Sequence, residues 1–84
     1  MTKIVIYTTD DCPYCRLAKE LLASRKTSFE EIRIDLDDGK REEMIRLSKR
    51  RTVPQIFIND QSIGGYEDLA ALAKSGKLDG LLNS

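Results

Sequence analysis

The chain has two cysteines, and they lie three positions apart in the segment Cys12-Pro13-Tyr14-Cys15. Such a pair can hold either two thiols or one disulfide, so switching between these states is two-electron redox chemistry. The pair follows the apolar run 3–8 and precedes a strongly helical stretch, so Cys12 is expected where a strand gives way to a helix. Free backbone N–H groups at a helix start favour negative charge, and a nucleophilic thiolate is such a charge.

The two cysteines are expected to have different roles. Cys12 lies nearer the helix start and is predicted to be the more exposed nucleophile, whereas Cys15 can attack a mixed disulfide formed on Cys12. A structural disulfide is disfavoured because so short a loop gains little entropy and a reducing compartment would open it. A zinc site needs about four ligands, and the chain has no histidine and no further cysteine, so no metal is expected.

Length and composition set the frame for this chemistry. The 84 residues predict one domain, 1–84, and the 14 acidic and 14 basic residues leave no net charge that would attract nucleic acid or an anionic membrane. No apolar run approaches the roughly 18 residues of a membrane span, and the N-terminus enters a strand without signal-peptide architecture. We therefore expect a cytoplasmic protein that keeps its thiols reduced, with a monomer as the default state.

The elements that must position the cysteines alternate along the chain. Hydrophobic periodicity predicts strands over 4–7, 29–36, 55–58 and 61–63 and helices over 13–25, 40–50 and 66–74. Asp37 or Asp38 is the expected cap of the second helix, Asn59-Asp60 the hairpin turn and Gly76 the terminator before a short final turn. The first two strands should pair in parallel through a right-handed crossover helix. The order β-α-β-α-β-β-α indicates an α/β sheet with helices on its faces. The expected core includes Leu17, Leu21, Leu22, Ile32, Ile34, Ile56 and Phe57.

Three segments in this order resemble the glutaredoxin family: Cys12-Pro13-Tyr14-Cys15, Thr52-Val53-Pro54 and Gly64-Gly65-Tyr66-Glu67-Asp68. The similarity runs over nearly the whole chain and is greatest to the small bacterial dithiol members. It implies a thioredoxin fold, with a central mixed four-stranded sheet flanked by helices. It also implies glutathione as the reducing cosubstrate, no tightly bound cofactor, and reduction of protein disulfides and protein–glutathione mixed disulfides. Glutathione reductase and NADPH would then be indirect partners.

The resemblance further implies a glutathione site. Pro54 would be the family's cis-proline, and the backbone of Val53 would pair with the cysteine portion of glutathione. Read alone, Pro54 is better explained as an ordinary strand-entry proline. The γ-glutamyl carboxylate would bind the amides of Glu67 and Asp68, and its α-ammonium the Asp68 side chain. Glycine at Gly65 lets a ligand approach the backbone closely, whereas Asp68 read alone is a first-turn acid that complements the helix dipole.

A basic run, Arg46, Lys49, Arg50 and Arg51, is for the most part a solvated helix face. Arg51 is the best candidate for the glycyl carboxylate of glutathione, with Arg50 second, and Tyr14 either packs against the ligand or is a surface residue. The glutathione-binding residues implied by the resemblance are Tyr14, Arg51, Thr52, Val53, Pro54, Gly65, Tyr66, Glu67 and Asp68.

One departure from the family pattern concerns charge near the nucleophile. Many relatives carry a lysine at the position of Thr9, whereas this chain has Asp10 and Asp11 next to Cys12. Each nearby negative charge disfavours a thiolate by up to about 1 kcal/mol at 4 Å in water. We expect the helix start still to favour the thiolate, but less strongly than in relatives with the lysine.

Two other functions stay open. A thioredoxin-like domain reduced by a flavoenzyme would share the fold and the cysteine pair, but the segment 64–68 and Arg51 oppose it. An iron–sulfur carrier would hold a cluster between two protomers through Cys12 and glutathione, and Pro13 disfavours it by family analogy.

Overall fold

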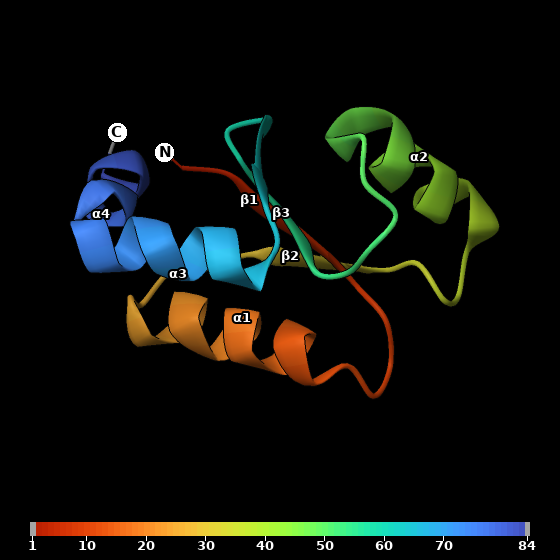
Figure 1. Cartoon of the computed structure of the whole chain (residues 1–84), viewed down its shortest axis with the longest axis horizontal. Coiled ribbons are helices and arrows are strands. Elements are labelled where there is room, and N and C mark those ends of the chain that lie inside the picture. The colour runs from red at the N-terminus through yellow and green to blue at the C-terminus, as the bar shows by residue number, and fades with distance from the viewer. Residues whose placement is uncertain (1, 84) are drawn as a thin grey trace.

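The computed structural model describes residues 2–83, which form a four-stranded sheet with helices on both faces (Figure 1). The first and last positions of the predicted domain 1–84 lie outside the described residues. The elements are β1 (Ile4–Thr8), α1 (Pro13–Ser24), β2 (Glu30–Arg33), α2 (Asp38–Ser48), β3 (Gln55–Ile58), β4 (Gln61–Gly64), α3 (Tyr66–Ser75) and α4 (Lys77–Leu82). The predicted order β-α-β-α-β-β-α is confirmed, and the predicted final turn is the short helix α4. The helices within residues 2–83 include none long and apolar enough to cross a bilayer.

The sheet has the strand order β2-β1-β3-β4 and mixed strand directions. β1 and β2 pair in parallel, which confirms the predicted crossover through α1, and the β1–β3 and β3–β4 pairs are antiparallel. In the β1–β3 register, Tyr7 lies opposite Gln55. The end of β1 that leads to Cys12 therefore lies beside the beginning of β3, which follows Pro54. Antiparallel pairing therefore brings the cysteine segment 12–15 and the proline segment 52–54 to the same end of the sheet.

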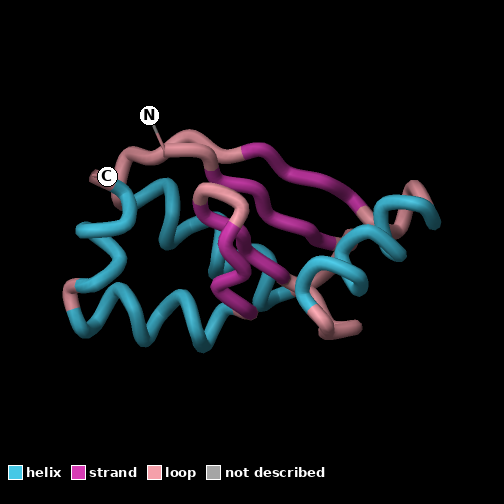
Figure 2. Tube along the Cα trace, turned by 90° about the horizontal axis from the view of Figure 1, so that it is seen from above, coloured by secondary structure: helices cyan, strands magenta, loops and turns pink. Residues whose placement is uncertain are grey.

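Each face of the sheet packs against different helices, as Figure 2 shows from above. Because successive strand residues point to opposite faces, Ile6 and Ile56 pack into one core cluster with Ala18 and Leu22 of α1 and Leu69 of α3. The opposite face carries a smaller cluster of Tyr7, Ile34, Met44 and Phe57, to which α2 contributes Met44. Full burial of such side chains is worth about 1.5–3 kcal/mol each, so the two clusters hold α1 and α2 on opposite sides of the sheet.

The buried face of α1 differs from the prediction. Cys15, Ala18 and Leu22 are buried, whereas Leu17, which was predicted to be a core residue, is 41% exposed. Successive helix residues are rotated by about 100°, so Leu17 lies about 130° from the centre of the face formed by Cys15, Ala18 and Leu22 and falls outside it. The prediction placed the apolar stripe too far round the helix because it did not count Cys15 as a core residue. The other predicted core residues, Leu21, Leu22, Ile32, Ile34, Ile56 and Phe57, are buried or half-buried.

Two elements differ from their predicted bounds: β2 is shorter, and α2 keeps its predicted length but begins and ends two residues earlier. β2 ends at Arg33 instead of residue 36. The Arg33 guanidinium donates two hydrogen bonds to the Asp35 carboxylate, from Nε to Oδ1 at 2.7 Å and from Nη2 to Oδ2 at 2.6 Å. Helix α2 ends at Ser48 instead of residue 50, because Lys49 adopts a left-handed conformation with φ +63°. Arg50 and Arg51 therefore lie in the loop before β3.

The predicted caps and turns are confirmed. Asp37 caps α2, because its Oδ1 accepts the N–H of Gly39 at 2.8 Å. Asn59 and Asp60 have φ values of +51° and +67°, the left-handed conformation that a tight hairpin turn requires. Gly76 ends α3 with φ +84°, which an achiral residue adopts without steric cost.

Candidate active site

The cysteine pair lies at the start of α1. Cys12 is the N-cap of the helix, and its Sγ accepts the backbone N–H of Cys15 at 3.2 Å. Both cysteines are free thiols; Cys12 is partly exposed, whereas Cys15 is 1% exposed. The predicted difference in accessibility is confirmed. A sulfur that accepts an amide hydrogen bond at a helix start is positioned to carry negative charge.

Cys15 has a different environment from Cys12. Burial raises the pKa of the Cys15 thiol well above its usual range, and its hydrogen bond with Cys12 raises it further. At neutral pH Cys15 is therefore a thiol and not a thiolate. An attack by Cys15 requires its proton to leave first.

A small cavity of about 150 Å³ lies beside the two sulfur atoms and is lined mostly by charged side chains. Its lining residues are Thr9, Asp10, Asp11, Cys12, Cys15, Arg16, Lys19, Glu31 and Arg33. Three acids thus meet three cations around the cysteines. Asp10 and Asp11 were predicted to lie near the nucleophile, whereas the cations were not. The i, i+4 spacing of Cys15 and Lys19 does place that lysine on the same side of the helix.

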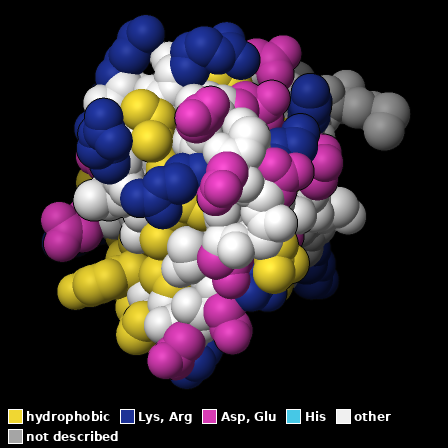
Figure 3. Space-filling model, turned by 90° about the vertical axis from the view of Figure 1, so that its right-hand side faces the viewer, with side chains coloured by type: hydrophobic (Ala, Val, Ile, Leu, Met, Phe, Trp, Pro, Cys, Tyr) yellow, Lys and Arg dark blue, Asp and Glu magenta, His cyan; other side chains and the backbone are white. Residues whose placement is uncertain are grey.

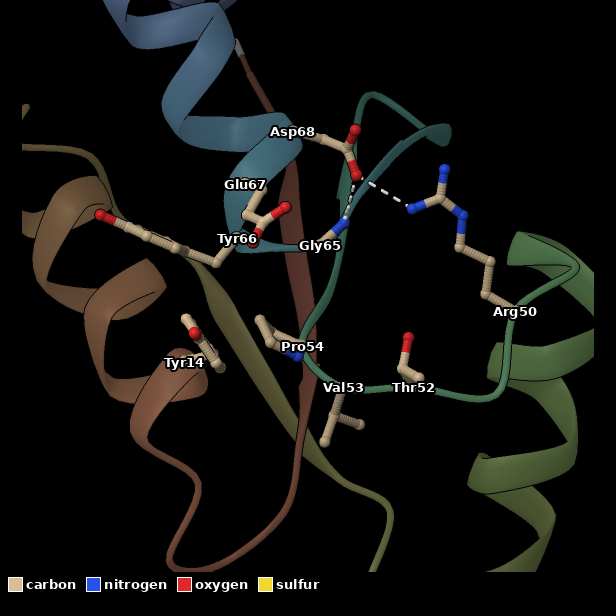
Figure 4. Close-up of a pocket in the computed structure, with 9 residues that line it drawn as sticks. All are labelled: Tyr14, Arg50, Thr52, Val53, Pro54, Gly65, Tyr66, Glu67 and Asp68. Atoms are coloured by element: carbon tan, nitrogen blue, oxygen red, sulfur yellow. Dashed lines mark hydrogen bonds and ion pairs between the residues drawn. The ribbon is translucent and has the colours of Figure 1, made fainter.

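A second pocket, of about 270 Å³, opens between α1, the loop before β3 and the start of α3 (Figure 4). It is lined by Tyr14, Arg50, Thr52, Val53, Pro54, Gly65, Tyr66, Glu67 and Asp68. The structure therefore brings together all the predicted glutathione-binding residues except Arg51. Arg50, the second choice in the sequence reasoning, lines the pocket in place of Arg51.

Opposite charges face each other at the rim of this pocket. The Arg50 Nη1 lies 2.9 Å from the Asp68 Oδ2, and the same oxygen accepts the backbone N–H of Gly65 at 3.0 Å. The Gly65 amide and, second, the Arg50 guanidinium hold the pKa of the Asp68 carboxyl below its usual range. Asp68 thus caps the start of α3, the role expected from its position alone, and also presents a carboxylate to the pocket (Figure 4).

Gly64 allows this arrangement. Its φ of +114° is in a region that side-chain-bearing residues rarely adopt, and a Cβ there would collide with the Asp68 carboxylate. The same Cβ would lie 3.0 Å from Arg50 Nη1. Gly65 was predicted to let a ligand approach the backbone closely. In the structure, Gly64 makes room for the ion pair, and Gly65 donates its amide to Asp68.

The remaining walls are aromatic and proline side chains. Tyr14 and Tyr66 have ring centroids 6.1 Å apart at an interplanar angle of 32°, and Tyr14 is 56% exposed. The Val53–Pro54 peptide bond is cis, as the resemblance implied, and both residues lie on the pocket floor between Tyr14 and Thr52 (Figure 4). The pocket therefore combines an apolar floor with a charged rim.

A dithiol pair begins the first helix, and a cis-proline lies at the same end of the mixed sheet. Together these features define a thiol oxidoreductase of the thioredoxin fold. Comparison with known families narrows this class. The family model described as glutaredoxin matches residues 4–63, and the chain belongs to the glutaredoxin family.

Relatives agree over almost the whole chain. Glutaredoxin 3 of Escherichia coli strain K12 is 56% identical over 82 residues, covering 98% of this chain and 99% of that protein. A glutaredoxin of Pseudomonas aeruginosa is 46% identical over 84 residues, covering 100% of both chains. Among solved structures, glutaredoxin from Brucella melitensis matches with a TM-score of 0.86 at 48% identity, covering 98% of this chain and 89% of that one. A buckwheat glutaredoxin–glutathione complex matches with a TM-score of 0.90 at 26% identity, covering 98% and 77%.

Proposed function

We propose that this chain reduces protein disulfides and protein–glutathione mixed disulfides with glutathione as its reductant. The observation that carries the proposal is the pair of opposite charges, Arg50 and Asp68, at the rim of the pocket beside the cysteine-bearing helix. Glutathione has a carboxylate at each end and an ammonium at one end, so it needs both kinds of partner. The buckwheat relative solved as a glutathione complex supports the same ligand.

Each end of glutathione has a matching group in the pocket. The α-ammonium pairs with the Asp68 carboxylate, and the adjacent carboxylate binds the free amides of Glu67 and Asp68 at the start of α3. The glycyl carboxylate pairs with Arg50, which replaces Arg51 in this role. The Arg50 and Asp68 side chains are 52% and 45% exposed, and so exposed an ion pair is worth about 0.2–1 kcal/mol. A ligand that offers each side chain a new partner displaces that pair at little cost.

The reaction begins at Cys12. Its thiolate attacks the glutathionyl sulfur of a mixed disulfide, and the protein substrate leaves as a thiolate that takes up a proton. A second glutathione thiolate then attacks the glutathionyl sulfur on Cys12, which releases oxidised glutathione and restores Cys12. Holding the tripeptide beside Cys12 makes the attack effectively unimolecular.

A protein disulfide requires Cys15 as well. The Cys12 thiolate attacks one sulfur of the substrate, and a mixed disulfide forms between Cys12 and the substrate. Cys15 loses its proton and attacks the Cys12 sulfur, which releases the second substrate thiolate and leaves a Cys12–Cys15 disulfide. Two glutathione molecules then reduce this disulfide and form one molecule of oxidised glutathione.

A coupled assay tests the proposal. The reduction of a glutathionylated protein is followed through NADPH oxidation, once with glutathione and glutathione reductase and once with thioredoxin reductase alone. We expect turnover in the first mixture and little in the second. Equal turnover with thioredoxin reductase would instead support the flavoenzyme-driven alternative. We propose the cytoplasm as the compartment, because glutathione is kept reduced there.

Cysteine variants separate the two routes. Cys15→Ser should retain reduction of glutathionylated proteins and lose reduction of protein disulfides, because its remaining thiol supports the one-cysteine route. Cys12→Ser should lose both activities, since the buried Cys15 thiol is a poor first nucleophile. Substantial turnover by Cys12→Ser would overturn this assignment of roles.

A further inference from the structure

Lys19 lies one turn of α1 after Cys15, and its ammonium group is held in place from the neighbouring strands. Its Nζ lies 2.9 Å from Glu31 Oε2 of β2. The same carboxylate oxygen accepts the Thr8 hydroxyl of β1 at 2.7 Å, and Thr8 is fully buried. This chain of contacts orients Lys19 from two adjacent strands, and the side chain is 35% exposed.

The held lysine shares the small charged cavity with both cysteines. Its positive charge lowers the pKa of Cys15, against the larger effect of burial. The hydrogen bond from Thr8 and, second, that from Lys19 hold the pKa of Glu31 below its usual range, so Glu31 stays ionised and is a poor proton acceptor at neutral pH. The network therefore holds the Lys19 ammonium near Cys15, and Glu31 orients that ammonium without acting as a general base. The other charged groups that line the cavity are Asp10, Asp11, Arg16 and Arg33.

We propose that Lys19, positioned by Glu31 and Thr8, stabilises the Cys15 thiolate as it forms and so speeds the step in which Cys15 attacks the mixed disulfide on Cys12. The inference deepens the proposed function, since it rests on the two-cysteine route. In this step the Cys15 proton passes to water, for which the cavity of about 150 Å³ has room. The Cys15 thiolate then forms a bond to the Cys12 sulfur, and the bond from that sulfur to the substrate breaks to give the substrate thiolate.

A stopped-flow experiment isolates this step. The reduced protein is mixed with excess of an aromatic disulfide whose thiolate is coloured. Attack by Cys12 releases one coloured thiolate at a rate proportional to the reagent concentration. Attack by Cys15 releases the second at a rate independent of that concentration. Because no glutathione is present, failure here is distinguishable from failure of the glutathione-dependent function.

Lys19→Gln should slow the second phase by about fivefold at neutral pH, the order expected for loss of one nearby charge, and move its pH profile upward. Lys19→Arg should restore most of the rate, because it keeps the charge. Glu31→Gln should give an intermediate rate, because it keeps the acceptor for Thr8 and releases the ammonium. Lys74→Gln is the matched control: it removes the same charge from an exposed site on α3 away from the cavity.

Three results would overturn the inference. The first is a second phase in Lys19→Gln as fast as in the unchanged protein. The second is an equal slowing of both phases, which would assign the effect to Cys12 or to the fold. The third is a Lys19→Arg variant as slow as Lys19→Gln, which would show that shape and not charge matters. A Glu31→Gln rate equal to that of the unchanged protein would remove Glu31 from the positioning role.

Discussion

Arg50 and Arg51 are adjacent in the sequence and carry the same charge, but of the two it is Arg50 that lines the pocket. Arg50→Gln should raise the apparent Michaelis constant for glutathione by about fivefold with little change in maximal rate. The reason is that loss of a partly exposed charged partner weakens ground-state and transition-state binding alike. Steady-state kinetics with a glutathionylated protein measure both constants.

Arg51→Gln is the matched control for this prediction. It removes the same charge one residue further along the loop and should leave the glutathione dependence close to that of the unchanged protein. The opposite order of effects would restore Arg51 as the partner of the glycyl carboxylate.

The sequence positions of the two arginines could not indicate which of them lines the pocket. Helical periodicity predicted a helix through residue 50, whereas Lys49 turns left-handed and ends α2 at Ser48. Lysine has no intrinsic preference for that conformation, so composition could not indicate it. The redox role of the cysteines, by contrast, could be predicted from their spacing, because Cys12 and Cys15 are the two cysteines of the chain.

At the scale of elements, the turn from β4 into α3 depends on Gly64. Gly64→Ala forces a side chain into a left-handed position and against the Asp68 carboxylate. We expect a loss of about 1–3 kcal/mol in the free energy of unfolding, measured by urea denaturation. In the proposed binding mode, the displaced carboxylate would no longer pair with the α-ammonium of glutathione, so the glutathione requirement should rise as well.

Gly80→Ala serves as the comparison for Gly64. Gly80 lies inside α4, and a Cβ there would meet nothing within 4 Å. Alanine is the better helix former by about 0.5–1 kcal/mol, so this variant should be as stable as the unchanged protein or more so. A Gly64→Ala protein with unchanged stability and unchanged glutathione dependence would contradict the structural role of Gly64.

Element types were predictable from local patterns, whereas element edges were not. Apolar runs and capping residues identified the strands and the three long helices. β2 ends at Arg33, and Asp35 just beyond it accepts the backbone N–H of Asp10 from the loop after β1. The orientation of α1 depends on Cys15 as a core residue. Both are tertiary facts, because they require knowing which surface the rest of the chain covers.

At the scale of the whole molecule, acid should unfold the protein through its paired carboxylates. The Arg33 guanidinium lowers the pKa of Asp35 to about 2, and the pKa values of Asp68 and Glu31 are also lowered. A folded-state pKa below the unfolded value of about 4 means that the ionised form favours the fold. This stabilisation is complete above that unfolded value and is lost as the pH falls through the folded-state values.

The urea midpoint should therefore be level between about pH 7 and 5 and fall between about pH 4 and 2. Asp35→Asn removes one of the titrating groups, so its midpoint should fall less steeply near pH 2. Measurements at constant ionic strength keep screening from imitating the effect. A midpoint that increases as the pH falls would have the wrong sign for this explanation.

The space-filling view shows cations and acids interspersed over the face that it presents (Figure 3). This agrees with the balance of 14 acidic and 14 basic residues. Overall composition therefore could not locate the site. The element order and the parallel pair were predictable, whereas the register that places Gln55 opposite Tyr7 was not, because it depends on two strands far apart in the chain.

The pocket beside the cysteine-bearing helix takes its walls from both layers of the molecule: Arg50 follows α2 on one side of the sheet, and Asp68 lies in the first turn of α3 on the other. A ligand that bound both side chains would link the helices on the two faces of the sheet. Its binding energy would add to the resistance of the fold against opening, to an extent set by its concentration relative to its dissociation constant. Amide hydrogens at the end of α2 and the start of α3 would then exchange with solvent more slowly in a cell rich in the reductant than in one depleted of it.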